Sequence, residues 1–220
     1  PQSYRRFMQE NLFDHISIRP ENTYVPDGLA TDVDAMCSAY ERTIEDLGGV
    51  DLQLLGLGHD GHIGFNEPSD HFPTRTHETA LAEITRQANA RFFASEAEVP
   101  TAAYTMGVGT VMAARRILMI VTGADKSDIL HKAFFGPVTP WVPASILQFH
   151  PDVTLICDRA AWDGVKHGFG QFFVRFLVML YLMEIYDIGF FDCVLLSLSN
   201  FFPPFLPGAQ GHHRPAPVWV

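Results

Sequence analysis

The stretch that most constrains the fold is a largely apolar run at residues 50–57, followed at once by a glycine-rich loop at residues 58–68. The run has the length of one strand, and its glycine boundary is typical of a strand buried within a parallel sheet. In such sheets, ligands bind beside the carboxyl ends of the strands. The sequence therefore predicts a parallel sheet whose ligand site includes this loop.

Helical and strand patterns alternate through the first 162 residues. Thr31 or Asp32 can cap a helix that Gly48 and Gly49 end. Further helices are expected at residues 4–12, 85–93, 110–115 and 125–135, and further strands at 117–121 and 153–157. This alternation predicts an α/β fold, with a doubly wound, mostly parallel sheet that carries helices on both faces.

The glycine loop has the spacing of a dinucleotide-binding fingerprint at Gly56, Gly58 and Gly61. That motif requires a helix to open at the third glycine. Gly64 and Pro68 follow closely and disfavour such a helix, so we do not expect NAD binding.

The loop also brings imidazole and carboxylate groups together. A metal site from His59, Asp60, His62 and Glu67 is a weak interpretation, because no cysteine pair or distant His-x-His pattern adds a zinc ligand. A stronger interpretation is acid–base chemistry, since a carboxylate beside an imidazole orients it and raises its pKa. The alternative is a structural role, in which Asp60 and His62 close the loop through backbone hydrogen bonds.

The charge balance restricts the partners. With 15 basic and 25 acidic residues, the formal net charge of −10 disfavours binding to nucleic acid or to an anionic membrane. A phosphate would have to be held by a few placed cations. The three cysteines are too few and too scattered for a disulfide framework, and no secretory signal pattern is visible, so a cytoplasmic location is expected.

Residues 163–220 differ in composition from the rest and contain half of the 18 phenylalanines. The uncharged run between Arg175 and Glu184, residues 176–183, is far shorter than the ~18–20 residues that span a bilayer, and the prolines at 203, 204 and 207 break any helix that follows. No membrane partner is expected. We interpret residues 1–162 as a partial α/β domain and residues 163–220 as an unexplained hydrophobic tail.

The string His-Asp-Gly-His-Ile-Gly-Phe-Asn-Glu-Pro at residues 59–68 resembles the signature of the glucosamine-6-phosphate deaminases. Separate matches in the same order lie at residues 90–93, 106–111 and 147–158, so the resemblance covers residues 1–162. The related 6-phosphogluconolactonases share the Gly-x-Asp-Gly-His core but continue with a Ser-Leu-Phe-Pro type of string. Residues 65–68 therefore favour the deaminases.

The resemblance implies a Rossmann-like fold and a hydrolase that acts in N-acetylglucosamine catabolism. The enzyme would open the ring of glucosamine 6-phosphate, isomerise the open aldose to a ketose and release ammonia, leaving fructose 6-phosphate. No metal or organic cofactor is implied. By motif position, His62 is the ring-opening acid and base, and Asp60 and Glu67 complete its relay. Arg91 and Lys126 match the positions that bind the substrate phosphate.

Two departures from the family pattern affect these expectations. Family members carry a glycine-rich phosphate loop and an Asp-Glu-Tyr string, whose Asp is the base for enolisation, ahead of the segment that matches Pro1. Neither string occurs in this chain, so the N-terminal part of the fold is missing, and we expect weak or no turnover and poor folding.

The second departure concerns regulation. Allosteric members carry Arg-Thr-Arg-x-Lys where this chain has residues 75–79, and His77 and Thr79 replace two of the basic residues. Activation by N-acetylglucosamine 6-phosphate is therefore not expected. The family also allows a homo-oligomer. Two other functions stay open: a 6-phosphogluconolactonase-like hydrolase, and a sugar-phosphate-binding protein without catalysis.

Overall fold

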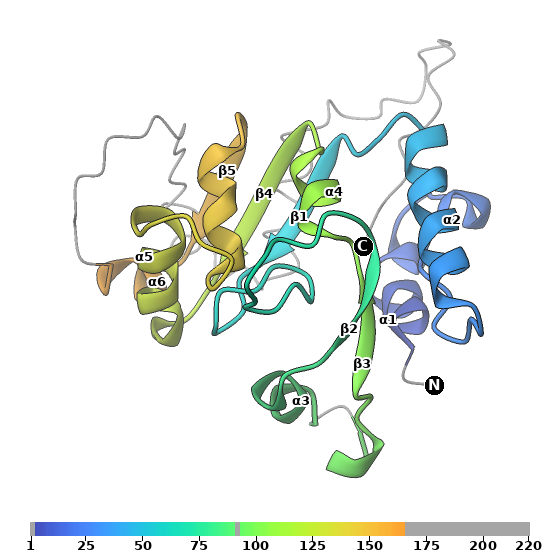
Figure 1. Cartoon of the computed structure of the whole chain (residues 1–220), viewed down its shortest axis with the longest axis horizontal. Coiled ribbons are helices and arrows are strands. Elements are labelled where there is room, and N and C mark those ends of the chain that lie inside the picture. The colour runs from blue at the N-terminus through green and yellow to red at the C-terminus, as the bar shows by residue number, and fades with distance from the viewer. Residues whose placement is uncertain (1–2, 91–92, 166–220) are drawn as a thin grey trace.

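A computed structural model describes residues 3–90 and 93–165 (Figure 1). Its centre is a parallel sheet of β1 (Leu52–Gly56), β4 (Arg116–Val121) and β5 (Val153–Cys157), in the order β1-β4-β5. The last residues of the strands meet at one edge, where Gly56 lies opposite Ile120, and Val121 opposite Cys157. The predicted α/β fold with a parallel sheet is confirmed.

Helices flank this sheet, with α5 and α6 beside β5 and α2 beyond β1 in Figure 1. The described helices are α1 (Tyr4–Asn11), α2 (Val33–Asp46), α3 (Glu83–Asn89), α4 (Val108–Met112), α5 (Ser127–Phe135) and α6 (Arg159–Asp163). The side chain of Asp32 caps α2 by accepting a hydrogen bond from the N–H of Ala35 at 3.0 Å. Gly48 and Gly49 end α2 with φ near +90°, a conformation that favours glycine.

The sequence did not predict a second, antiparallel sheet of β2 (His77–Ala80) and β3 (Ala102–Thr105). Its strands are short and mostly half-buried or exposed, so they lack the apolar run that marked the strands of the parallel sheet. The helices expected at 85–93 and 110–115 begin two residues earlier, at Glu83 and Val108.

The run at residues 50–57 forms the predicted strand, β1, but only part of it is buried. Among the described strands it pairs only with β4, at the edge of the sheet, and its side chains alternate between the interior and solvent. Leu54 is 42% exposed, whereas Leu55 is buried.

The core lies between β4, β5, α5 and the glycine loop. Met119, Leu130 and Leu147 are fully buried in it, and so is Ile63 from the loop itself. Burying an isoleucine contributes about 1.5–3 kcal/mol, so Ile63 fastens the loop to the body of the molecule. Val165 continues the core past residue 162, and the rest of the predicted tail lies outside the described residues.

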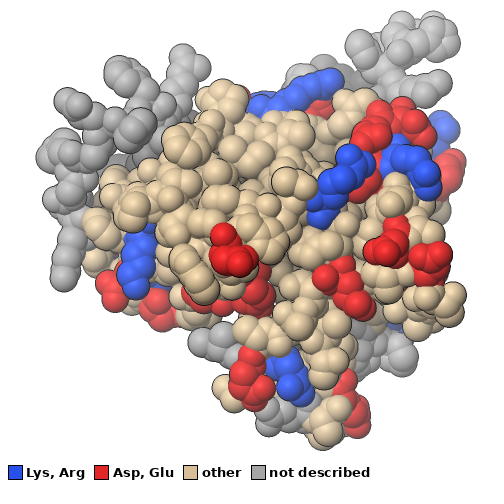
Figure 2. All heavy atoms as spheres, viewed as in Figure 1, with Lys and Arg blue, Asp and Glu red and all other residues tan. Residues whose placement is uncertain are grey.

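The surface is mixed in charge. On the face drawn in Figure 2, acidic side chains are spread over much of the described surface, with basic ones interspersed. Within the ranges that the structure describes, no helix has both the length and the apolar character needed to cross a membrane.

Candidate active site

The loop after β1 turns back on itself instead of opening a helix. Apart from a bridge between Ile63 and Asn66, residues 57–76 form neither helix nor strand, so the helix that a dinucleotide-binding motif requires at the third glycine is absent here. Gly61 has a φ of +89°, and a β-carbon there would lie 2.7 Å from Val142. The N–H of Gly58 donates to the carbonyl of His62 at 3.0 Å and closes the turn. The glycines therefore allow the loop to bring its polar side chains together.

The loop places one imidazole against two carboxylates. His62 Nδ1 lies 2.7 Å from Asp60 Oδ1 and 3.5 Å from Glu67 Oε2. Asp60 also accepts a hydrogen bond from the backbone N–H of His62 at 3.1 Å. The exposed fractions of the three side chains are 24% for Asp60, 19% for His62 and 13% for Glu67, so the cluster is largely shielded from water.

The electrostatics of this cluster favour a protonated imidazole. Burial lowers the pKa of His62, but the close contacts with Asp60 and Glu67 outweigh burial and raise it to about 9. Burial raises the pKa of Asp60. The contact with His62 has a larger, opposite effect and holds the pKa of Asp60 well below its usual range. Near neutral pH, the pair is therefore an imidazolium held by a carboxylate, which can donate a proton.

Residues distant in sequence support the cluster. The Thr85 hydroxyl on α3 donates to Glu67 Oε1 at 2.8 Å, and Thr105 Oγ1 on β3 accepts from the N–H of Phe65 at 3.0 Å. The buried amide of Asn66 donates to the carbonyls of Ile63 and Met106 at 2.9 and 2.8 Å. No local sequence pattern marks the two threonines, because their partners lie 18 and 40 residues away.

Of the two residues predicted to bind phosphate, the structure describes Lys126 but not Arg91. Lys126 follows β4 at the same edge of the sheet as the loop, and its Nζ donates to the carbonyl of Leu57 at 2.8 Å. Burial lowers the pKa of Lys126, while the charges of Asp125 and Asp60 oppose that effect. Arg91 lies outside the described residues.

The side chains considered for a metal do not all converge. Ligand atoms of Asp60, His62 and Glu67 lie within 4.8 Å of one another, whereas His59 turns away and pairs with Asp125 at 2.7 Å. The ion pairs of the three clustered side chains already account for their contact, so acid–base chemistry remains the interpretation that the geometry favours.

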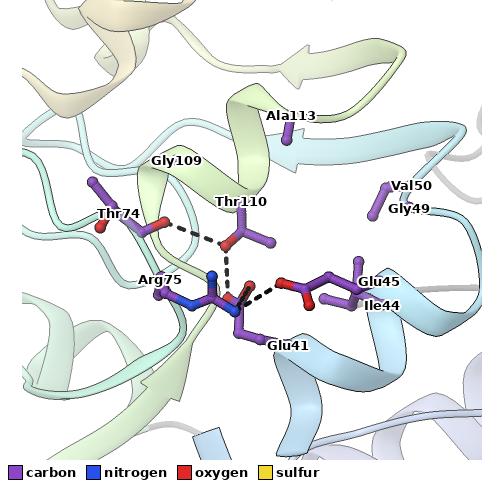
Figure 3. Close-up of a pocket in the computed structure, with 10 residues that line it drawn as sticks. All are labelled: Glu41, Ile44, Glu45, Gly49, Val50, Thr74, Arg75, Gly109, Thr110 and Ala113. Carbon is purple, nitrogen blue, oxygen red and sulfur yellow. Dashed lines mark hydrogen bonds and ion pairs between the residues drawn. The ribbon is translucent and has the colours of Figure 1, made fainter. Parts of the chain in front are cut away.

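A separate cavity of about 440 Å³ lies between α2, α4 and residues 74–75, and it shares no residue with the acid–base cluster (Figure 3). Glu41 reaches into it from α2 and accepts hydrogen bonds of 2.6 Å from the hydroxyls of Thr76 and Thr110. Arg75 pairs with Glu45 at 2.8 Å. In the Arg-Thr-Arg-x-Lys string of the allosteric members, Arg75 is the one basic position that this chain keeps. Its guanidinium is already paired with the carboxylate of Glu45.

Comparison with known proteins identifies the family to which the chain belongs. The model of the family described as glucosamine-6-phosphate isomerases/6-phosphogluconolactonase matches residues 1–156. The chain belongs to this family. Its cluster of Asp60, His62 and Glu67 therefore occurs in a family of sugar-phosphate enzymes.

Individual relatives separate the two branches of the family. Over 156 residues the chain is 61% identical to the glucosamine-6-phosphate deaminase of Lachnoclostridium phytofermentans, a match that covers 71% of this chain and 66% of the relative. A solved monomeric glucosamine-6-phosphate deaminase matches with 45% identity and a TM-score of 0.71, over 73% of this chain and 67% of that one. This match confirms the predicted Rossmann-like fold.

The likeness to lactonases is one of fold. The 6-phosphogluconolactonase of Thermotoga maritima matches with 20% identity and a TM-score of 0.52, over 69% of this chain and 63% of that one. The chain spans just under two thirds of the length of curated relatives such as the Lachnoclostridium protein. The names of the family and its relatives, isomerase and deaminase, also overturn the expectation of a hydrolase.

Proposed function

We propose that this chain carries the ring-opening site of a glucosamine-6-phosphate deaminase, which converts glucosamine 6-phosphate and water to fructose 6-phosphate and ammonia. The observation that carries the proposal is the imidazole of His62, held between the carboxylates of Asp60 and Glu67 at the carboxyl edge of the sheet. The 61% identity to a relative of that name favours this substrate over the lactone.

The chemistry begins with His62 as a proton donor. Its imidazolium gives a proton to the ring oxygen while the hydroxyl on C1 gives its proton to water, so the bond between C1 and the ring oxygen breaks and an aldehyde forms. Asp60 stabilises the imidazolium at 2.7 Å, and Glu67 lies on the same nitrogen at 3.5 Å. The later transfer of a proton from C2 to C1 is assigned to none of the described residues.

Lys126 would hold the substrate phosphate. An ammonium group has three N–H donors, and the carbonyl of Leu57 takes one of them at 2.8 Å. The remaining donors can meet phosphate oxygens beside the glycine loop. In a chain with a net charge of −10, such individual cations must supply the attraction, and Arg91 is the second candidate.

Ammonia release from glucosamine 6-phosphate tests the proposal. The assay compares this chain with a chimera that carries the N-terminal segment of the 61% identical relative. We expect release by the chimera, with a loss of about 100-fold or more in His62→Gln, since a general acid contributes about 10²–10⁴-fold. Hydrolysis of 6-phosphogluconolactone without ammonia release would overturn the proposal in favour of a lactonase. Binding of both sugar phosphates without turnover of either would instead favour a non-catalytic binding protein.

A cytoplasmic location, a homo-oligomer and the absence of activation by N-acetylglucosamine 6-phosphate stay predictions. The prediction that this ligand does not activate the enzyme rests on His77 and Thr79, which lie on β2 where the allosteric members have basic residues. Kinetics of the chimera that do not change when this ligand is added would support it, and a clear shift in apparent affinity would contradict it.

A further inference from the structure

We propose that Thr85 is a positioning residue, whose hydroxyl holds the Glu67 carboxylate toward His62. Its catalytic meaning rests on the proposed function above. Thr85 lies on α3, is only 5% exposed, and donates to Glu67 Oε1 at 2.8 Å. Because this hydrogen bond ends on Glu67, Thr85 would act on His62 through that carboxylate.

The two oxygens of Glu67 have different surroundings. Oε1 accepts the hydrogen bond from Thr85, whereas Oε2 is buried, lies 3.5 Å from His62 Nδ1 and has no hydrogen bond within the described part of the chain. The terminal torsion of a glutamate is broad and roughly two-fold, so it does not fix the carboxylate by itself. The hydrogen bond from Thr85 selects the orientation that directs Oε2 to the imidazole.

Asp60 does not need such an external partner. It accepts the backbone N–H of His62 at 3.1 Å, so the imidazole and this carboxylate are held within a single turn. Glu67 depends instead on α3, 18 residues further along the chain. The geometry of the acid–base cluster is therefore tied to the position of α3 through one hydroxyl group.

Removing that hydroxyl tests the proposal. Thr85→Val keeps the shape of the side chain and lacks the donor, and Thr85→Ser restores the donor. Thr43→Val is the matched control, because Thr43 donates only within α2, to the carbonyl of Ala39 at 2.9 Å. The pKa of His62 is measured by NMR titration of its ring in the 220-residue chain, with thermal unfolding to confirm that each variant folds.

We expect the pKa of His62 to fall toward the ordinary histidine value in T85V and to recover in T85S. The other charged groups that act on the cluster, Asp60 and Lys126, are unchanged in these variants. With T85V introduced into the chimera described above, turnover of glucosamine 6-phosphate should fall about tenfold or more in kcat with little change in KM, because a positioning residue affects the chemical step more than binding.

Two outcomes would overturn the role of Thr85: a folded T85V whose His62 titrates as in the wild type, or a T85S that titrates like T85V. The titration needs no turnover. If the chimera described above releases no ammonia, the proposed function fails, while the NMR result still decides whether Thr85 holds Glu67.

Discussion

Gly58 leaves the space that the ring of His62 occupies. A β-carbon at this position would overlap the imidazole, at its Nδ1, Cε1 and Cγ atoms. We expect Gly58→Ala to displace the ring from Asp60 and, in the chimera, to reduce kcat/KM on glucosamine 6-phosphate by about 100-fold, the lower end of what a general acid contributes. Gly28→Ala is the control, since no atom lies within 4 Å of its β-carbon. Equal activity of the two variants would contradict the placement of His62.

The charge of His62 also makes the stability of the molecule depend on pH. Its pKa in the folded chain is about 9, above the unfolded value of about 6.5. The stabilisation is therefore fully present below about pH 6.5 and is lost as the pH rises through 9. We expect the free energy of unfolding to fall by on the order of 2–3 kcal/mol between pH 6.5 and 9.5, measured by urea denaturation. His62→Gln should remove most of this decrease, and an equally steep decrease in that variant would refute the assignment.

At the scale of the elements, α2 carries a buried carboxylate, Glu41, that the sequence did not predict. Burial raises the pKa of Glu41, but hydrogen bonds from Thr110 and Thr76 outweigh burial and lower it. Glu41→Ala would leave those donors unpaired, and we expect a loss of about 2–4 kcal/mol in urea denaturation. Glu45→Ala, on the same helix and also paired with Arg75, should cost less than about 1 kcal/mol, because Glu45 is exposed. A similar loss in both variants would show that burial of Glu41 is not the cause.

The elements that the sequence predicted are those marked by local patterns, and the elements that it missed depend on contacts between distant residues. The apolar run of β4, the cap at Asp32 and the glycines that end α2 are local signals, and each led to the right element. The sheet of β2 and β3 has no such signal, because pairs such as His77 with Thr105 join residues far apart in the chain. In the site, the resemblance named Asp60, His62 and Glu67, whereas their support by Thr85 required the fold.

At the scale of the whole molecule, the glycine loop joins the two sheets. It leaves β1 of the parallel sheet and is bonded to the end of β3 through Phe65 and Asn66. Asn66 is 1% exposed, and Asn66→Ala removes its donors from the carbonyls of Ile63 and Met106. We expect a loss of about 1–3 kcal/mol, with faster hydrogen exchange in the loop and in β3.

The control for this variant is Asn11→Ala, which removes an amide donor to the carbonyl of Phe7 within α1. It should leave exchange in β3 unchanged. Exchange that rises equally throughout the molecule in Asn66→Ala would mean global destabilisation, and would contradict a local joint between the sheets.

The contacts of the cluster also differ in how far apart their residues lie in the chain. Asp60 and His62 are two residues apart, whereas Thr85 is 18 residues from Glu67 and Thr105 is 40 from Phe65. Closing a short loop costs less chain entropy than closing a long one. On folding, the pair of Asp60 and His62 can thus form as soon as its own turn closes, and Glu67 joins it only after α3 has docked. Local opening that moves α3 away from the loop would, for the same reason, release Glu67 from its hydrogen bond and leave the contact between Asp60 and His62 in place.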